Sequence, residues 1–552
     1  MNLNLPSKSY IKTYEEKKKA SNEVSELYES GLSFLSKVLG KLHGINSDQR
    51  YWEIILGLWL REISVIYIDR SKVVNDLDTY QKNELKEAFK GSKFIPKNYK
   101  EFSSSIETNA ALATLLFSRT DMSEDDFYFL SNFSKTSSFT EFNQDGLWNK
   151  AKYFFYKSLI RLRSNLILYT IEGCSGFDKA KIYFLTLGKA IPYIENSSPC
   201  NTEDNLQSSL RKNLLLDIKN DIKHPNAEFY IFLIKSLPCS YLENFKNLRE
   251  KKKNEIGVAP KKIFLDSRFR VEDEFKILLA EWCSRGTKTY VFQHSLNCLI
   301  DFDSSFQNDL TFDYYIYWDS LNDSEKKCSS IRLNKFVKNY RTKFKMENKF
   351  NLLQSLKNLE NDLYVCRTVT NNQGGSLAVT VRDSQSIKEG RLRLSESELN
   401  FEKKIVVRIR PGDSFGEENV KTNFSSSNNL FFSQSNQSIQ ELYNGSRINI
   451  FEGLSMGVTE CLALNRPFLV LNYNSYIDLR CSRLKHLFNE LKNLNIVHDN
   501  IETLNSMLTN DYVDRFYSSE FQKEITRISE TYFPVKENYL KDLIDLLKAK
   551  ND

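Results

Sequence analysis

The chain has 552 residues, of which 41% are hydrophobic and 27% are charged. This length exceeds a single ordinary core, and this composition is that of a folded protein rather than a disordered one. The net charge of +6, from 77 basic and 71 acidic residues, is spread along the chain, so it does not favour a nucleic-acid-binding protein.

The first twenty or so residues are too charged for a signal peptide, and no run of 18 apolar residues occurs. We therefore expect a protein that stays inside the cell. The nine cysteines are scattered, without a C-x-x-C pair or a cluster of Cys and His. This pattern predicts reduced thiols, and it indicates neither a disulfide framework nor a metal site.

Apolar residues recur at helical spacing near the N-terminus, and residues 1–175 are predicted to form a helical region. Residues 176–340 follow as a first α/β domain, in which β-rich apolar runs alternate with helical stretches. The predicted strands of this domain are 182–188, 228–234, 262–269, 288–295 and 313–319. The order strand, helix, strand implies a parallel sheet.

Residues 341–400 are largely polar and contain Gly374-Gly375, so they are predicted to connect two domains. Residues 401–515 then form a second α/β series. Its predicted strands are 405–411, 447–453, 466–473 and 494–499, with a helix at 455–465. The tail, 516–552, is predicted to form helices that Pro534 interrupts and that pack back on the first domain.

The predicted fold class is therefore α/β, with two Rossmann-like domains facing a cleft and a helical N-terminal region. Open parallel sheets bind ligands outside the carboxyl ends of their strands. Functional residues are therefore expected on loops that follow predicted strands.

Gln293-His294-Ser295 follows one predicted strand of the first domain. An imidazole at this position can act as a general base near neutral pH, or it can donate a hydrogen bond to a phosphate. A histidine that only fixes the loop through backbone contacts is the alternative.

Asp266 and Arg268 follow another strand of the first domain, and Glu272 and Glu274 then begin a helix. The two glutamates are of the kind that complements a helix dipole. Asp266 or Arg268 could face the cleft, where a carboxylate could activate an acceptor hydroxyl group.

Arg408 and Arg410 lie on one face of a predicted strand in the second domain, and Asp413 lies in the turn after it. A planar guanidinium can bind phosphate through two hydrogen bonds. A surface strand paired with acidic neighbours is the alternative, but the apolar residues between the arginines favour phosphate.

Ser455, Gly457, Thr459 and Glu460 begin the helix after the strand at 447–453. Small and hydroxyl residues there would leave backbone N–H groups available to an anion, and Glu460 could bind ribose or sugar hydroxyls. A capping sequence of a structural helix would look similar. Near the N-terminus, His43 is a further cleft candidate because it lies on a loop, although its aromatic neighbours indicate core.

Together these segments resemble a bacterial family of transferases of the leptospiral type, from surface-polysaccharide and nonulosonate gene clusters. Four blocks carry the resemblance. They are His43 with Tyr51, Trp52 and Trp59; Phe275, Ala280 and Gly286 with Gln293-His294; Arg408 with Asp413; and Ser446-Arg447 with Thr459-Glu460, Leu462, Ala463 and Pro467. Where the family has Gln-His-Gly, this chain has Ser295 in the third position.

The resemblance implies a GT-B-like glycosyltransferase that moves a sugar from a nucleotide-activated donor to a surface polysaccharide or glycolipid. The second domain would hold the nucleotide, and the first would present the acceptor and the base, with His294 and Asp266 as catalytic candidates. No metal or other cofactor is expected, because helix dipoles and arginines can neutralise the leaving phosphate. Peripheral contact with the inner face of the cytoplasmic membrane is also expected.

Two other functions stay open. One is transfer of a polyol phosphate from a CDP-glycerol-type donor, which would leave a phosphodiester. The other, suggested by Ser295, is a catalytically silent binding subunit of a polysaccharide assembly complex.

Overall fold

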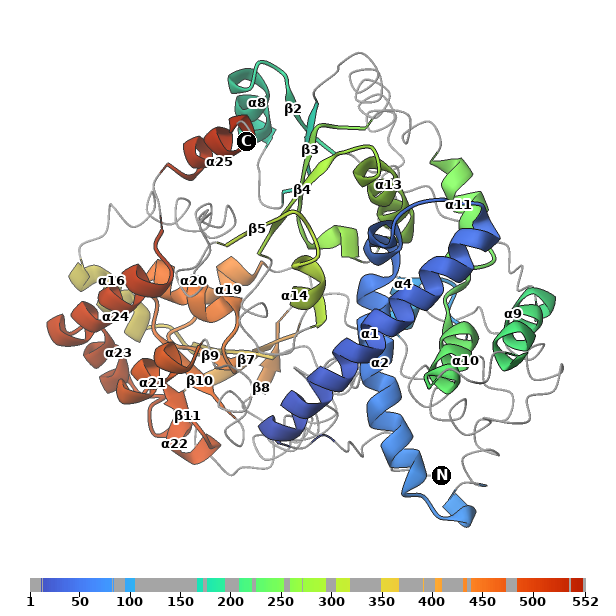
Figure 1. Cartoon of the computed structure of the whole chain (residues 1–552). Helices are drawn as coiled ribbons and strands as arrows, with labels where there is room; N and C mark the ends of the chain where they lie inside the picture. Colours follow the sequence, from blue (N-terminus) through green and yellow to red (C-terminus); the bar gives the residue numbers. More distant parts are fainter. Residues whose placement is uncertain are drawn as a thin grey trace.

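The structure is a computed structural model, and it describes the following residues: 11, 13–81, 83, 95–104, 166–171, 176–193, 208–220, 225–252, 259–270, 272–293, 304–317, 349–366, 391, 403–409, 430–433, 438–472, 484–535 and 538–549. Within these residues the chain forms two parallel sheets with helices around them, preceded by two long helices (Figure 1).

The first sheet has five strands in the order β2-β1-β3-β4-β5, and every neighbouring pair is parallel. Its strands are β1 (Ile167–Tyr169), β2 (Ala190–Pro192), β3 (Lys262–Leu265), β4 (Lys288–Phe292) and β5 (Tyr314–Ile316). The chain adds strands on one side of β1 and then on the other, so the order reverses between β1 and β3. Such a switch point leaves a crevice at the carboxyl ends of the strands.

The second sheet has six strands in the order β11-β10-β9-β6-β7-β8, again all parallel. Its strands are β6 (Asn361–Val365), β7 (Lys404–Arg408), β8 (Leu430–Phe432), β9 (Asn449–Glu452), β10 (Phe468–Leu471) and β11 (Val497–His498). Here the strand order reverses between β6 and β9, which are neighbours.

The helices α1 (Tyr14–His43) and α2 (Gln49–Asn75) pack along each other. The first begins at a capping box between Thr13 and Glu16, and it ends at Gly44, whose φ of 66° favours glycine. Both helices share one hydrophobic core with residues of the first sheet, so they belong to the first domain.

The other helices of the first domain are α4 (Tyr99–Ser104), α8 (Gly176–Leu185), α9 (Ser208–Asn220), α10 (Ala227–Ser236), α11 (Phe245–Lys251), α13 (Asp273–Cys283) and α14 (Ser304–Asp309), with the 3-10 helices η2 (Cys239–Tyr241) and η3 (Ser267–Arg270). The later helices are α16 (Lys349–Lys357), α19 (Ile439–Asn444), α20 (Met456–Leu464), α21 (Lys485–Asn493), α22 (Ile501–Asn505), α23 (Asn510–Phe516), α24 (Ser519–Tyr532) and α25 (Tyr539–Lys548).

Two predicted strands are wrong. The segment 182–188 belongs largely to α8, and 228–234 lies within α10. Both are short apolar runs, and a short apolar run in a buried helix cannot be distinguished from a strand by periodicity. Conversely, β1 lies inside the predicted helical region 1–175, and β6 lies inside the predicted connection 341–400. The two sheets therefore begin earlier in the chain than expected.

The C-terminal helices divide between the two domains. Tyr539 and Leu543 of α25 pack with Phe264 and Tyr290 of the first sheet, and α25 lies beside α8 (Figure 1). The helix α24 instead packs on α20 and α21. The expectation that the whole of 516–552 packs on the first domain is therefore wrong for α24. Pro534 lies between the two helices, where the sequence predicts the interruption.

Candidate active site

The start of α20 lies at the switch point of the second sheet. β9 ends at Glu452, Gly453 turns with a φ of 78°, and α20 begins after Ser455. Ser455 has extended backbone angles and is half-buried, yet its hydroxyl group does not cap the helix. Because the first N–H groups of a helix attract anions, a phosphate would be stabilised at this position.

Gly457 is required by packing. A Cβ atom at this position would lie 2.2 Å from a ring carbon of Phe451 and 2.7 Å from the Tyr443 hydroxyl. The glycine therefore lets α20 approach β9 closely. Packing thus explains this glycine, and its backbone N–H lies at the helix start, where binding of a donor phosphate stays a prediction.

Thr459 and Glu460 are both buried within α20. The Thr459 hydroxyl donates to the Met456 carbonyl at 2.8 Å, one turn back in the same helix. Glu460 is 2% exposed. Burial raises the pKa of the neighbouring Cys461 thiol, and the negative charge of Glu460 raises it further. The binding of sugar hydroxyls by Glu460 stays a prediction.

A buried ion pair lies at the carboxyl end of β9, and no local sequence motif indicates it. Arg391 donates from Nε to Glu452 Oε1 at 2.7 Å and from a second nitrogen to the other carboxylate oxygen. The Tyr364 hydroxyl also donates to Glu452, at 2.8 Å. Both charged side chains are at most 2% exposed. Burial alone would lower the pKa of Arg391, but the negative charge of Glu452 stabilises the protonated guanidinium, so the pKa lies above its usual value.

Arg408 is the last residue of β7 and lies at the same edge of the sheet. It pairs in register with Val365 of β6, which in turn pairs with Phe451 of β9. Arg408 as a whole is 7% exposed, and its guanidinium donates to the Ser433 hydroxyl at 3.3 Å. Desolvation lowers the pKa of Arg408 from its usual value. Arg410 and Asp413 lie outside the described residues.

The switch point of the first sheet carries Asp266. This residue directly follows β3 and is 6% exposed, and its backbone N–H donates to the Thr170 hydroxyl at the end of β1, at 2.8 Å. Gln293 follows β4 at the same edge, and its backbone N–H donates to the Ile316 carbonyl at 2.9 Å. His294 lies outside the described residues, and so does the side chain of Arg268.

A cavity of about 90 Å³ lies at the carboxyl ends of β1 and β2. It is lined by Tyr169, Thr170, Ile171, Lys179, Pro192, Tyr193, Glu272 and Phe275. Glu272 stands at the start of α13 without capping it, and burial raises the pKa of its carboxyl group. Glu272 stands where the sequence predicts a carboxylate that complements the helix dipole. It is also a polar group among the aromatic rings that line the cavity.

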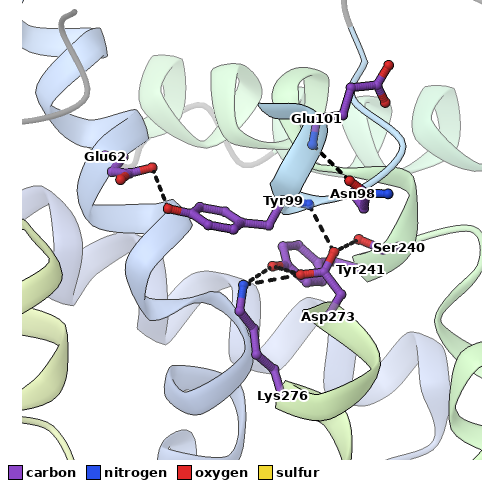
Figure 2. A network of polar contacts seen from close by, with 8 residues as sticks. All are labelled: Glu62, Asn98, Tyr99, Glu101, Ser240, Tyr241, Asp273 and Lys276. Carbon is purple, nitrogen blue, oxygen red and sulfur yellow. Dashed lines mark hydrogen bonds and ion pairs between the residues drawn. The ribbon is translucent and has the colours of Figure 1, made fainter. Parts of the chain in front are cut away.

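A buried polar network holds α13 in place beside this cavity (Figure 2). The Asp273 carboxylate accepts from the Tyr99 N–H at 2.9 Å, from the Ser240 and Tyr241 hydroxyls at 2.6 and 2.7 Å, and from Lys276 at 3.1 Å. Burial lowers the pKa of Lys276, and the Asp273 carboxylate opposes this shift. Because the Asp273 carboxylate accepts all of these hydrogen bonds from within the protein, the network holds the start of α13 against its neighbours and indicates a structural role.

His43 is packed among aromatic rings. Its ring lies 4.6 Å from that of Phe245 and 6.1 Å from that of Trp52, and Nε2 donates to the Tyr241 carbonyl at 3.3 Å. Burial lowers the pKa of His43 to about 4. These contacts place His43 in the helical layer formed by α1, α2 and α11, and they explain the residue structurally.

Arg447, another residue of the family blocks, lies at the opposite edge of the second sheet. Its guanidinium donates to both carboxylate oxygens of Asp362 at 3.0 and 2.8 Å, and to the Leu508 carbonyl at 2.8 Å. This fully buried pair joins the amino ends of β6 and β9. Its position indicates a role in stability rather than in ligand binding.

A family model settles what kind of protein this is. The model for the LIC12162 family transferase matches residues 5–515. The chain belongs to this family. The resemblance found in the sequence is thereby confirmed, and so is the expectation that the protein is a transferase. The predicted α/β class, with two Rossmann-like parallel sheets and a helical N-terminal region, is confirmed by the structure.

Two solved structures are also similar to the chain. MurG of Acinetobacter baumannii has 10% sequence identity and a TM-score of 0.31, with 69% of this chain and 98% of that chain covered. The UDP-GlcNAc 2-epimerase of Neisseria meningitidis, bound to UDP-GlcNAc, has 13% identity and a TM-score of 0.35, with 70% and 99% covered. A comparison with proteins of curated function found no match.

Among the described residues, no three His, Cys, Asp or Glu side chains gather as metal ligands would. Within the same residues, none of the helices has the length and apolar character needed to cross a bilayer.

Proposed function

We propose that this transferase is a glycosyltransferase of the GT-B type, which moves a sugar from a nucleotide-activated donor to a glycan or glycolipid at the bacterial surface. The observation that carries the proposal is the position of α20. Its uncapped start lies at the switch point of the second sheet, next to Glu452 and at the same sheet edge as Arg408. This combination suits the diphosphate of a nucleotide donor.

The first domain would present the acceptor. The cavity at β1 and β2 has aromatic walls and one carboxyl group, Glu272, which suits a sugar ring with hydroxyl groups. Tyr317, just after β5, is buried in the core of the second domain, so the carboxyl edge of the first sheet meets that domain at β5. The proposed donor and acceptor sites thus belong to adjoining domains.

In the proposed reaction, an acceptor hydroxyl oxygen attacks the anomeric carbon of the donor sugar. The bond from that carbon to the phosphate oxygen breaks, and the nucleotide leaves with its phosphate. Asp266 or His294 takes the proton of the hydroxyl group. The α20 dipole and Arg408 stabilise the charge on the leaving phosphate, so the proposed reaction uses no metal ion.

The test is a transfer assay with a panel of nucleotide sugars and polyol-linked nucleotides, and with glycan and glycolipid acceptors. Mass spectrometry of the product separates three outcomes. A glycoside, formed equally well with a metal chelator present, supports the proposal. A phosphodiester would instead establish polyol-phosphate transfer. Nucleotide binding without turnover on any acceptor would favour the binding subunit.

A further inference from the structure

The helix α8 and the turn after it expose an unusual amount of apolar side chain. The described part of the chain has eight large hydrophobic side chains that are strongly exposed, and four of them lie between residues 177 and 187. They are Phe177 at 69%, Phe184 at 72%, Leu185 at 53% and Leu187 at 82%. Singly exposed apolar residues are common, but a group of this size marks an interaction site.

Helical spacing brings these side chains together. Phe177, Lys181 and Phe184 follow one another at intervals of four and three residues, so they lie along one face of α8. Ile182 and Thr186 lie on the other face and are buried. Figure 1 shows α8 at an outer edge of the molecule, with α25 beside it. The outward face of α8 is therefore apolar while its inward face is already packed.

Leu187 adds a second, independent observation. Its φ is 52°, in the left-handed region, which glycine and asparagine adopt more readily than leucine. Because 82% of this side chain is exposed, no packing within the chain offsets the strain. An exposed leucine in a strained turn is better explained by contact with something outside the chain.

The surface around these apolar residues is positively charged. Lys181 and Lys189 are exposed, and neither forms an ion pair within the described residues. The Lys181 ammonium group lies 4.6 Å from the centre of the Phe177 ring. Lys179 is exposed too, but it lies on the side of α8 that faces the cavity at β1 and β2. The one acid of α8, Asp178, is 9% exposed. The neighbouring α25 adds two lysines and two aspartates, so it does not change the balance.

We propose that this α8 surface, made of Phe177, Lys181, Phe184, Leu185, Leu187 and Lys189, docks the protein on an anionic lipid membrane. Apolar side chains would enter the interface while the lysines meet lipid phosphates. A second copy of the chain is a poorer occupant, because a two-fold contact through this surface would place the same lysines against each other.

The surface also explains how a lipid-linked acceptor could reach the enzyme. Lys179, from the same helix, lines the cavity at β1 and β2. Lys179 faces away from Phe177 across the helix, so docking through α8 would hold that cavity roughly one helix diameter, about 10 Å, from the lipid surface. This last step rests on the proposed function, whereas membrane docking itself does not.

The test is co-sedimentation of the full chain with vesicles of phosphatidylglycerol and phosphatidylethanolamine, or of phosphatidylcholine alone. We expect binding to the anionic vesicles only, and weaker binding at high salt. Lys181→Gln with Lys189→Gln should weaken binding roughly 25-fold, at about fivefold per lysine. Phe184→Gln with Leu187→Asn should weaken it at least tenfold without lowering the melting temperature, since Asn tolerates the left-handed turn.

The matched control is Leu216→Gln, an exposed leucine on α9 that is 49% exposed and outside the α8 surface; it should bind vesicles like the wild type. The proposal is overturned if the wild type does not bind anionic vesicles at low salt, or if the variant with Phe184→Gln and Leu187→Asn binds them as well as the wild type does. It is also overturned if light scattering shows that the wild type is a dimer and that the variant dissociates it without weakening vesicle binding. Transfer to a water-soluble acceptor, measured in parallel, tests the proposed function separately.

Discussion

Arg391 and Glu452 form a buried ion pair at the carboxyl end of β9, although 61 residues separate them in the chain. The arginine comes from a segment that the sequence indicates only as a connection between domains. Through this pair, that segment is tied to the strand that leads into α20.

Replacing Arg391 should show how much the ion pair with Glu452 contributes to the free energy of unfolding. Arg391→Met removes the guanidinium that pairs with the buried Glu452 carboxylate, so we expect a loss of about 3–5 kcal/mol in the free energy of unfolding. Arg391→Met with Glu452→Met removes both charges and should cost less than the single change. Urea unfolding measures both. A single variant within about 1 kcal/mol of the wild type would contradict the account.

The sequence predicted the second domain well where strong local signals exist. The strand at β9, the turn at Gly453 and the helix α20 are recognisable because an apolar run, a glycine and a helix start follow one another. The pair of Arg391 and Glu452 leaves no local signal, because it depends on tertiary structure. The first domain was predicted less well, since α8 and α10 are short apolar helices and β1 has three residues.

A second prediction concerns Gly457. Gly457→Ala would force a Cβ against Phe451, so the free energy of unfolding should fall by about 1–3 kcal/mol, as in other overpacked cores. Gly176→Ala is the matched control, because a Cβ there meets nothing within 4 Å. Thermal unfolding of the two variants checks this. Equal melting temperatures would show that α20 can shift away from β9.

A third prediction concerns pH. The pKa of His43 is about 4 in the folded protein and about 6.5 in the unfolded chain, so the unfolded state takes up this proton first as the pH falls. The stability contributed by neutral His43 is therefore full above about pH 6.5 and is lost progressively towards pH 4. The slope from this one group is at most about 1.4 kcal/mol per pH unit.

Denaturant unfolding between pH 7 and pH 4 measures this slope. His43→Gln should have a smaller slope than the wild type, while His486→Gln, at an exposed histidine, should keep it. If the free energy of unfolding falls equally with pH in His43→Gln and in the wild type, the claim that His43 is buried in its neutral form is contradicted.

A fourth prediction concerns the proposed bases. His294→Ala or Asp266→Asn should lower the transfer rate by about 100-fold or more for whichever residue takes the proton, while nucleotide binding and folding stay near those of the wild type. Single-turnover kinetics and calorimetric binding separate the two effects. Full turnover in both variants would show that neither residue is the base.

The central claim is that the start of α20 binds the phosphates of the donor, and Ser455→Asp tests it most directly. Asp is a good N-cap residue and complements the helix dipole, so folding should be unchanged or improved, but its charge should repel a phosphate. Ser438→Asp places the same residue at the N-cap of α19, in the same domain, as the control.

The measurement is calorimetric titration of the three proteins with a panel of nucleoside mono- and diphosphates. We predict that the wild type and Ser438→Asp bind one of these nucleotides with the same affinity, and that Ser455→Asp binds it at least tenfold more weakly at an equal or higher melting temperature. Equal affinity in Ser455→Asp, or a wild type that binds none of the nucleotides, would contradict the claim.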